Sequence, residues 1–193
     1  ITANPGNPTS QNHPENCCLA PAPLEGHVYR AHNPRWSFAP DSGAGAAQYG
    51  GRFNPVGLPA LYASLRPETA WLEAQQAFPL KPQPVTLCAY VVACRAVIDL
   101  TDPRNREHLD ITWDELACPW ELLLDRGTTP PTWPLVARLR EKGWQAAKVP
   151  SFAPGADGDD INVVFWDWSV QGPCAVRVID DWGRLPRDAA SWS

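Results

Sequence analysis

Short apolar runs, separated by polar and loop-forming residues, predict strands along much of the chain. In residues 27–32 (HVYRAH), Val28 and Arg30 fall on one face and Tyr29 and Ala31 on the other, as the two-residue period of a strand requires. Further runs with strand character cover residues 60–63, 85–92, 96–99, 145–149, 162–166 and 175–179. We therefore expect a sheet at the core of the protein.

Helices are predicted between these strands. Pro67 suits the first position of a helix, and Ser64 lies upstream as a candidate cap. The Phe78-Pro79 pair would end this helix, because a residue before proline avoids helical geometry. Shorter helical pieces are expected over residues 103–109, 112–116 and 134–142. Residues 33–51 are rich in glycine and proline and are expected to form a loop.

Length and composition indicate one compact but loop-rich domain. The chain has 193 residues, of which 44% are hydrophobic, and its 22 prolines are about twice the usual share. We expect an irregular arm over residues 1–25 and a single domain over residues 26–193. The chain contains no Met and begins at Ile1, so we also expect further residues upstream.

Charge and hydropathy argue against two classes of partner. The net charge of −5 and the lack of a basic run do not indicate the basic surface that direct nucleic-acid binding usually requires. No apolar stretch reaches the roughly 18 residues of a membrane helix, and the polar N-terminal segment is unlike a signal peptide. We expect a cytoplasmic protein without a membrane partner.

The cysteines and acidic residues do not form a recognisable metal site. There are six cysteines but no C-x-x-C pair and no His/Cys cluster with zinc spacing. The acidic run GADGDD (residues 155–160) does not fit an EF-hand loop. We therefore expect no metal and six reduced cysteines, with only the adjacent Cys17 and Cys18 as a candidate reactive pair.

Four side chains between residues 27 and 73 suit a common ligand. The guanidinium groups of Arg30 and Arg52 can clamp a pyrophosphate, and Gly50-Gly51 before Arg52 lets the backbone approach closely. The ring of Tyr62 can hold a flat heterocycle, and the carboxylate of Glu73 can stabilise a cationic sugar. This combination suits cleavage of a dinucleotide at its glycosidic bond.

Each of these residues also has a purely structural interpretation. Arg30 could lie on an exposed face or pair with an Asp, and Arg52 could be a solvated residue of a hairpin turn. Tyr62 could be a core residue whose hydroxyl reaches a partner. Glu73 shares a face with Ala70 and Ala74, so it is expected to be partly desolvated and could pair with an Arg.

Two later polar residues are further candidates. Ser151 opens the acidic loop, and Asn162 starts a predicted strand. As isolated residues, both are more commonly turn formers than binding residues. Their assignment to a site depends on the motifs that surround them.

In order along the chain, these motifs resemble those of the RES domain family. The matching segments are Y-R (29–30), G-G-R-F-N-P (50–55), L-Y-A-S (61–64), A-W-L-E (70–73), V-P-S (149–151) and N-V-V (162–164). The family usually has Trp where this chain has Phe53, which is a conservative departure. The resemblance covers about residues 26–179.

The resemblance implies an α+β fold like that of ADP-ribosyltransferases, with a split, strongly twisted mixed sheet, flanking helices, long loops and an NAD cleft. NAD+ would be consumed as a substrate. Arg30 and Arg52 would hold its pyrophosphate and ribose, Tyr62 would pack on nicotinamide, and Ser151 and Asn162 would line the cleft. Glu73 would bind a hydroxyl of the nicotinamide ribose and stabilise positive charge as the bond breaks.

The family implies a toxin of a bacterial toxin–antitoxin pair, with an Xre-like antitoxin that blocks the NAD cleft. Such a toxin would transfer ADP-ribose to a cytosolic protein, or act as an NAD+ glycohydrolase or phosphorylase that depletes NAD+. A non-catalytic nucleotide-binding module is the third alternative, against which Arg30, Tyr62 and Glu73 argue together. The sequence does not distinguish the first two.

Overall fold

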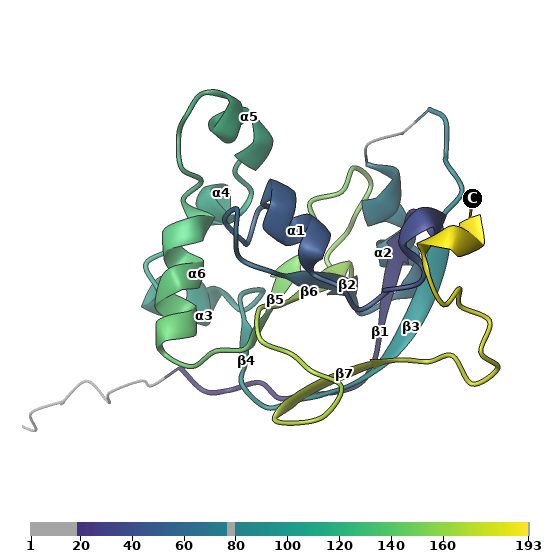
Figure 1. Cartoon of the computed structure of the whole chain (residues 1–193). Helices are drawn as coiled ribbons and strands as arrows, with labels where there is room; N and C mark the ends of the chain where they lie inside the picture. Colours follow the sequence, from purple (N-terminus) through teal and green to yellow (C-terminus); the bar gives the residue numbers. More distant parts are fainter. Residues whose placement is uncertain (1–18, 77–79, 193) are drawn as a thin grey trace, which may run out of the picture.

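The computed structural model describes residues 19–76 and 80–192 and contains one mixed sheet with flanking helices (Figure 1). The strands are β1 (Leu24–His32), β2 (Leu61–Ser64), β3 (Thr86–Cys94), β4 (Val97–Asp99), β5 (Ala146–Pro150), β6 (Ile161–Phe165) and β7 (Cys174–Val178). Their order in the sheet is β4-β5-β6-β2-β1-β3-β7. Only β4 and β5 pair in parallel; the other neighbours in this sheet are antiparallel. The expected α+β class is confirmed.

The sheet is divided between β1 and β2. Strand β1 pairs with β3 over its whole length, from Leu24 opposite Cys94 to His32 opposite Thr86. On its other side, β1 shares a single pair with β2, Tyr29 opposite Ser64. Because Ser64 ends β2, the rest of β2 diverges from β1, and this is the split that the family resemblance led us to expect.

Helices cover the two halves of the sheet unevenly. They are α1 (Ala44–Tyr49), α2 (Pro67–Gln75), α3 (Pro103–His108), α4 (Trp113–Leu116), α5 (Trp120–Asp125) and α6 (Thr132–Glu141), with 3-10 turns η1 (Pro34–Trp36) and η2 (Ala189–Trp192). Figure 1 shows α3, α4 and α6 grouped at the β4–β5 end, and α5 standing away from the sheet. Helix α2 contacts β1, β2, β3 and β6, so it spans the split.

Two apolar clusters lie on opposite faces of the sheet. Along β6, Val163 and Phe165 belong to the cluster that includes Tyr90, whereas Val164 belongs to the cluster that includes Leu135 and Leu139. This alternation follows from the two-residue period of a strand. Strands β5 and β6 therefore pack against an apolar cluster on each face and form a base for the elements at the split.

The structure corrects three local expectations. Residues 33–51 are not only a loop, because they contain η1 and α1. Helix α1 forms where AGAAQY offers several strong helix formers, and the side-chain amide of Asn54 donates to the carbonyl of Ala46 within it. Helix α5 was not expected. Ser64 does not cap α2 but ends β2, and Arg66 is the N-cap residue.

The ends of two expected segments lie outside the described residues. Helix α2 ends at Gln75, with Gln76 as its C-cap residue, so it stops before the predicted Phe78-Pro79 pair, which itself lies outside the described residues. Residues 1–18 of the expected arm are likewise not described, and the proposed boundary at residue 25 remains a prediction. The backbone N–H of Ala22 donates to the carbonyl of Val97 at 2.8 Å, so the chain already contacts β4 before β1 begins.

The expectation of six reduced cysteines was wrong for one pair. Cys94 and Cys174, 80 residues apart in sequence, form a disulfide because they stand opposite each other at the ends of β3 and β7. Each alone resembles a small apolar strand residue, and only the pairing of the strands brings the two sulfur atoms together. Cys88 and Cys118 are buried free thiols, and Cys17 and Cys18 fall outside the described residues.

Two kinds of feature are absent from the described residues. No helix there is both long enough and apolar enough to cross a bilayer. No group of three or more His, Cys, Asp or Glu side chains in the same part of the chain is arranged to hold a metal ion.

Candidate active site

A cleft opens where β1 and β2 diverge. Its smaller part, about 280 Å³, lies against the split itself and is walled by short side chains such as Ala31, Ala63 and Ala74. Its larger part, about 770 Å³, extends toward α1 and α5. Both parts share four lining residues, namely Arg30, Tyr62, Glu73 and Asn162. The larger part has the size of a typical small-molecule site.

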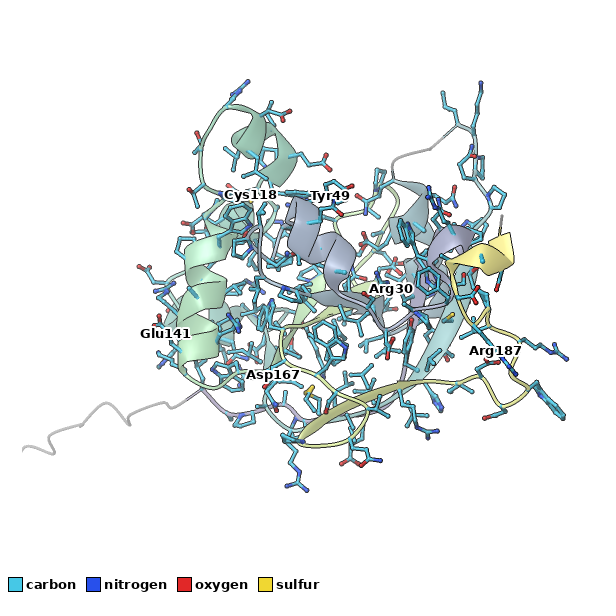
Figure 2. The ribbon with its side chains drawn as sticks, in the orientation of Figure 1. Arg30, Tyr49, Cys118, Glu141, Asp167 and Arg187 are labelled. Carbon is cyan, nitrogen blue, oxygen red and sulfur yellow. A yellow bond between two sulfur atoms is a disulfide. The ribbon has the colours of Figure 1, made fainter. Side chains whose placement is uncertain are left out.

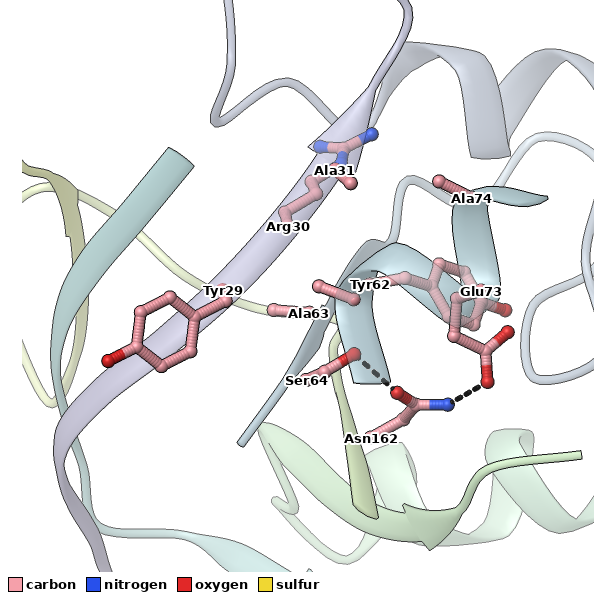
Figure 3. A pocket seen from close by; sticks show the side chains of 10 residues that line it. Tyr29, Arg30, Ala31, Tyr62, Ala63, Ser64, Glu73, Ala74 and Asn162 are labelled. Atoms are coloured by element: carbon pink, nitrogen blue, oxygen red, sulfur yellow. Dashed lines mark hydrogen bonds between the residues drawn. The ribbon is translucent and has the colours of Figure 1, made fainter. Parts of the chain in front are cut away.

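The carboxylate of Glu73 is held by neutral hydrogen-bond donors. The hydroxyl of Ser151 donates to its Oε1 at 2.6 Å. The amide of Asn162 donates to the same atom, and Figure 3 shows this second bond. The amide of Gln76 donates to Oε2. None of the ion pairs among the described residues involves Glu73, so the alternative of a Glu–Arg pair is wrong. Its negative charge is therefore available to a cationic group in the cleft.

Ser64 fixes the orientation of Asn162. Ser64 and Asn162 face each other across β2 and β6, and the buried Ser64 hydroxyl donates to Asn162 Oδ1 at 2.6 Å. This bond leaves the NH2 end of the amide directed at Glu73, as Figure 3 shows. A chain of donors thus runs from Ser64 through Asn162 to Glu73 and is joined there by Ser151.

The loop that carries Ser151 is tied to the start of α2. Its last residue, Asp160, is buried and accepts hydrogen bonds from the hydroxyl of Thr69 and from the N–H of Asp157. These bonds lower the pKa of Asp160 below its usual range, because they favour the charged carboxylate. Since Thr69 and Glu73 lie on the same helix, the hydrogen bond between Thr69 and Asp160 helps to hold Ser151 beside Glu73.

Arg30 is largely enclosed and forms no ion pair among the described residues, although the nearby carboxylate of Asp41 partly offsets the effect of burial on its pKa. Its Nη1 donates to the carbonyl oxygens of Pro40 and Ser42, at 3.1 and 3.0 Å. Burial lowers the pKa of Arg30, since desolvation disfavours the charged form. Figure 2 shows Arg30 within the body of the molecule, whereas Glu141 and Arg187 lie at its periphery. An enclosed cation of this kind is stabilised by an anionic ligand.

Arg52 is fixed against the loop before α5. Its Nη1 donates to the carbonyl oxygens of Leu116 and Cys118, and its guanidinium stacks on the ring of Phe152 at 4.6 Å. Burial lowers its pKa as well. The alternative of a solvated turn residue is therefore wrong, and Arg52 places a second, partly desolvated cation in the larger part of the cleft.

The hydroxyl of Tyr62 is already occupied by its own fold. It donates to Oδ1 of the buried Asn54 at 2.8 Å and accepts from the N–H of Phe53 at 3.0 Å. Burial raises the pKa of Tyr62, so the phenol stays protonated. The structural interpretation of the hydroxyl is thus confirmed. The ring nevertheless lines both parts of the cleft, where it can contact a ligand.

The chain matches the RES domain model over residues 27–188, which is most of its length. The protein belongs to the RES domain family. Among solved structures, it is similar to a chain of the M. tuberculosis MbcT-MbcA toxin-antitoxin complex, with a TM-score of 0.58 and 20% identity. That alignment covers 84% of this chain and 87% of the other, and at this identity it shows a shared fold. No curated protein matched the sequence.

The six residues predicted for this RES domain come together in the structure. Arg30, Arg52, Tyr62, Glu73 and Asn162 line the cleft. Ser151 joins them through its hydrogen bond to Glu73. Their assembly supports a common site, whereas the binding role of each residue remains a prediction.

Several residues of the site were missed by the sequence analysis. Ser64 and Asn54 stand inside the quoted motifs of the RES domain, which was the signal that could have identified them. Gln76 lies three residues after Glu73, one helical turn away, where side chains on the same face meet. No local pattern indicates that Phe152 stacks on Arg52 or that Trp120 lines the cleft, because both contacts join distant segments.

Proposed function

We propose that this protein is an NAD+-consuming toxin of a bacterial toxin–antitoxin pair that acts in the cytoplasm. It would cleave the bond between nicotinamide and ribose and transfer ADP-ribose to a cytosolic protein. The observation that carries the proposal is the carboxylate of Glu73, held by Ser151 and Asn162 without a cation, in a cleft that also contains two enclosed guanidinium groups. Membership of the RES domain family supports the same conclusion.

The chemistry needs charge complementarity more than a strong base. When the bond breaks, its electron pair goes to the nicotinamide nitrogen and leaves a ribosyl oxocarbenium ion. The carboxylate of Glu73 would stabilise that cation electrostatically. Arg30 and Arg52 would hold the pyrophosphate and so fix the ribose beside Glu73. The nucleophile of the acceptor then bonds to the ribose carbon and loses its proton to solvent.

A second candidate is hydrolysis or phosphorolysis of NAD+. Gln76 is exposed beside Oε2 of Glu73, so water or phosphate could reach a ribose carbon held at Glu73 from the solvent side of Gln76. Mass spectrometry of lysate proteins after incubation with NAD+ separates the two candidates. A mass increase of one ADP-ribose on a protein indicates transfer, and free ADP-ribose or its phosphate indicates the second.

The proposed partner is an Xre-like antitoxin that blocks the cleft. The similar solved chain comes from a toxin-antitoxin complex, which supports an antitoxin partner here. Nicotinamide release is therefore best measured on the purified chain freed of any partner.

Replacement of the central carboxylate tests the function. We expect Glu73→Gln to lower kcat for nicotinamide release about 100-fold or more with little change in KM, because the lost charge acts on the transition state. Glu68→Gln is the matched control, since Glu68 lies on the same helix but is exposed and paired with Arg66. Equal turnover by Glu73→Gln and the parent would contradict the proposal.

A further inference from the structure

Helix α5 is apolar but packs into neither core. Its sequence is WELLLD, yet none of its six residues is buried, and Leu122 is 45% exposed. In Figure 1 the helix stands away from the sheet at the end of a loop. An exposed apolar surface of this kind commonly marks a site that a ligand or partner covers.

The first turn of α5 forms one wall of the larger part of the cleft. Pro119, Trp120, Glu121 and Leu122 line it, together with Tyr49 of α1, which is 70% exposed. None of these residues lines the smaller part at the sheet split. Helix α5 therefore belongs to the end of the cleft that lies beyond the split.

Arg52 places α5 relative to the other groups of the site. Its guanidinium donates to the carbonyls of Leu116 and Cys118, and the N–H of Trp120 donates to the same Cys118 carbonyl at 2.8 Å. Arg52, like α5, lines only the larger part, whereas Glu73 lines both parts. The order along the cleft is thus the split, Glu73, Arg52 and then α5.

This order matches the order of groups in a dinucleotide, and the inference rests on the proposed function. With the nicotinamide ribose at Glu73 and the pyrophosphate at the arginines, the remaining half of NAD+ reaches α5. We propose that α5 forms the adenosine subsite, with Trp120 packing against the adenine ring. The ring of Phe152 is already covered by Arg52, and Tyr49 belongs to α1, so Trp120 is the aromatic side chain that α5 itself contributes to the cleft.

The chemistry of this wall suits adenine. A purine is flat and aromatic, and a half-buried indole offers a large, rigid surface for it at little cost in conformational entropy. The apolar edge contributed by Pro119 and Leu122 would be covered when the nucleoside binds. The apolar surface of α5 that is exposed in the unbound protein would thus be covered by the ligand.

Binding of two ligand halves tests the assignment. Calorimetry in the Glu73→Gln background, in which turnover is slow, would compare ADP-ribose with nicotinamide mononucleotide, which lacks adenosine. We expect Trp120→Ala to weaken ADP-ribose binding about tenfold and to change nicotinamide mononucleotide binding less than twofold. Trp182→Ala is the control, because Trp182 is 82% exposed and does not line the cleft.

The outcomes separate this inference from the proposed function. Unchanged ADP-ribose affinity in Trp120→Ala, or equal loss for both ligands, overturns the adenosine subsite while the proposed function stands. A folded parent that binds neither ligand contradicts the proposed function and this assignment with it. Because no residue of α5 is buried, Trp120→Ala is expected to keep the melting temperature of the parent.

Discussion

Three neutral side chains hold the carboxylate of Glu73, and this arrangement has a functional consequence. An arginine at the same place would neutralise the charge, whereas the hydroxyl of Ser151 and the amide of Asn162 orient the carboxylate without neutralising it. Electrostatic stabilisation of a developing cation requires this kind of preorganised charge. Glu73 is close enough to Arg52 to offset part of the effect of burial on the pKa of Arg52 but forms no ion pair with it. The two arginines of the site instead donate to backbone carbonyls.

Ser64 is predicted to act as a positioning residue for Asn162. Ser64→Ala frees the amide of Asn162 to turn its oxygen toward Glu73, which repels the carboxylate. We expect kcat for nicotinamide release to fall about tenfold with KM nearly unchanged, and the free energy of unfolding to fall by about 1 kcal/mol.

Ser37→Ala is the matched control for this prediction. Ser37 is equally buried, and its hydroxyl donates to Thr86 at 2.6 Å, away from the cleft. The Ser37→Ala variant should lower the free energy of unfolding by a similar amount and leave kcat at the parent value. A Ser64→Ala variant whose kcat matches that of Ser37→Ala would show that Ser64 has only a structural role.

At the scale of elements, the turn between α1 and β2 links the arginine to the aromatic ring. Gly51 and Asn54 bridge each other through their backbones, and Asn54 Oδ1 accepts from the hydroxyl of Tyr62. Trp133 of α6 donates to the carbonyl of Gly51 at 2.9 Å. The turn therefore joins α1, β2 and α6, so that Arg52 and Tyr62 are positioned together.

Gly51 is predicted to be required by close packing in this turn. A Cβ atom there would lie 2.6 Å from Asn54 Oδ1 and 2.7 Å from the Tyr62 hydroxyl oxygen. We expect Gly51→Ala to lower the free energy of unfolding by about 1–3 kcal/mol, because the turn or the ring must shift. Chemical denaturation measures the loss. Gly158→Ala, where a Cβ meets open space, should stay within about 0.5 kcal/mol of the parent, and equal values for both variants would refute the packing argument.

At the scale of the whole molecule, the disulfide and the site lie at different ends of β1 and β3. Cys94 pairs with Leu24 at the start of β1, whereas Cys88 pairs with Arg30. Six residues of strand, or about 20 Å, separate the disulfide at Cys94 from the position of Arg30. The disulfide links the edge strand β7 to the sheet, and its state depends on the redox conditions around the protein.

Reduction of the disulfide is predicted to affect stability rather than activity. A reductant should lower the free energy of unfolding of the parent by about 2–4 kcal/mol, because the unfolded chain regains freedom. A Cys94→Ala/Cys174→Ala variant should be insensitive to the reductant in the same denaturation experiment. Nicotinamide release should be unchanged by reduction, and a parallel loss of activity would show that the disulfide influences the site.

The sequence by itself determined the strands and the order of the candidate residues, whereas the α+β class was expected through the family resemblance. Strand periodicity and the Gly-Gly-Arg turn are local patterns, and local steric and solvation preferences decide them. The membership of Arg30, Arg52, Tyr62, Glu73 and Asn162 in one cleft was also predictable, but through the resemblance of the ordered motifs to the RES domain family. No local rule would have joined them.

Only the tertiary structure decided how these pieces meet. Strand pairing brings Ser64 against Asn162 and Cys94 against Cys174, each pair separated by about 80 or more residues. It also closes the loop before α5 onto Arg52, 66 residues away. Such contacts depend on which strands become neighbours in the sheet and where β1 and β2 diverge. The order of the strands and the position of the split depend on burying both apolar cores at once. No single segment of the sequence therefore specifies them.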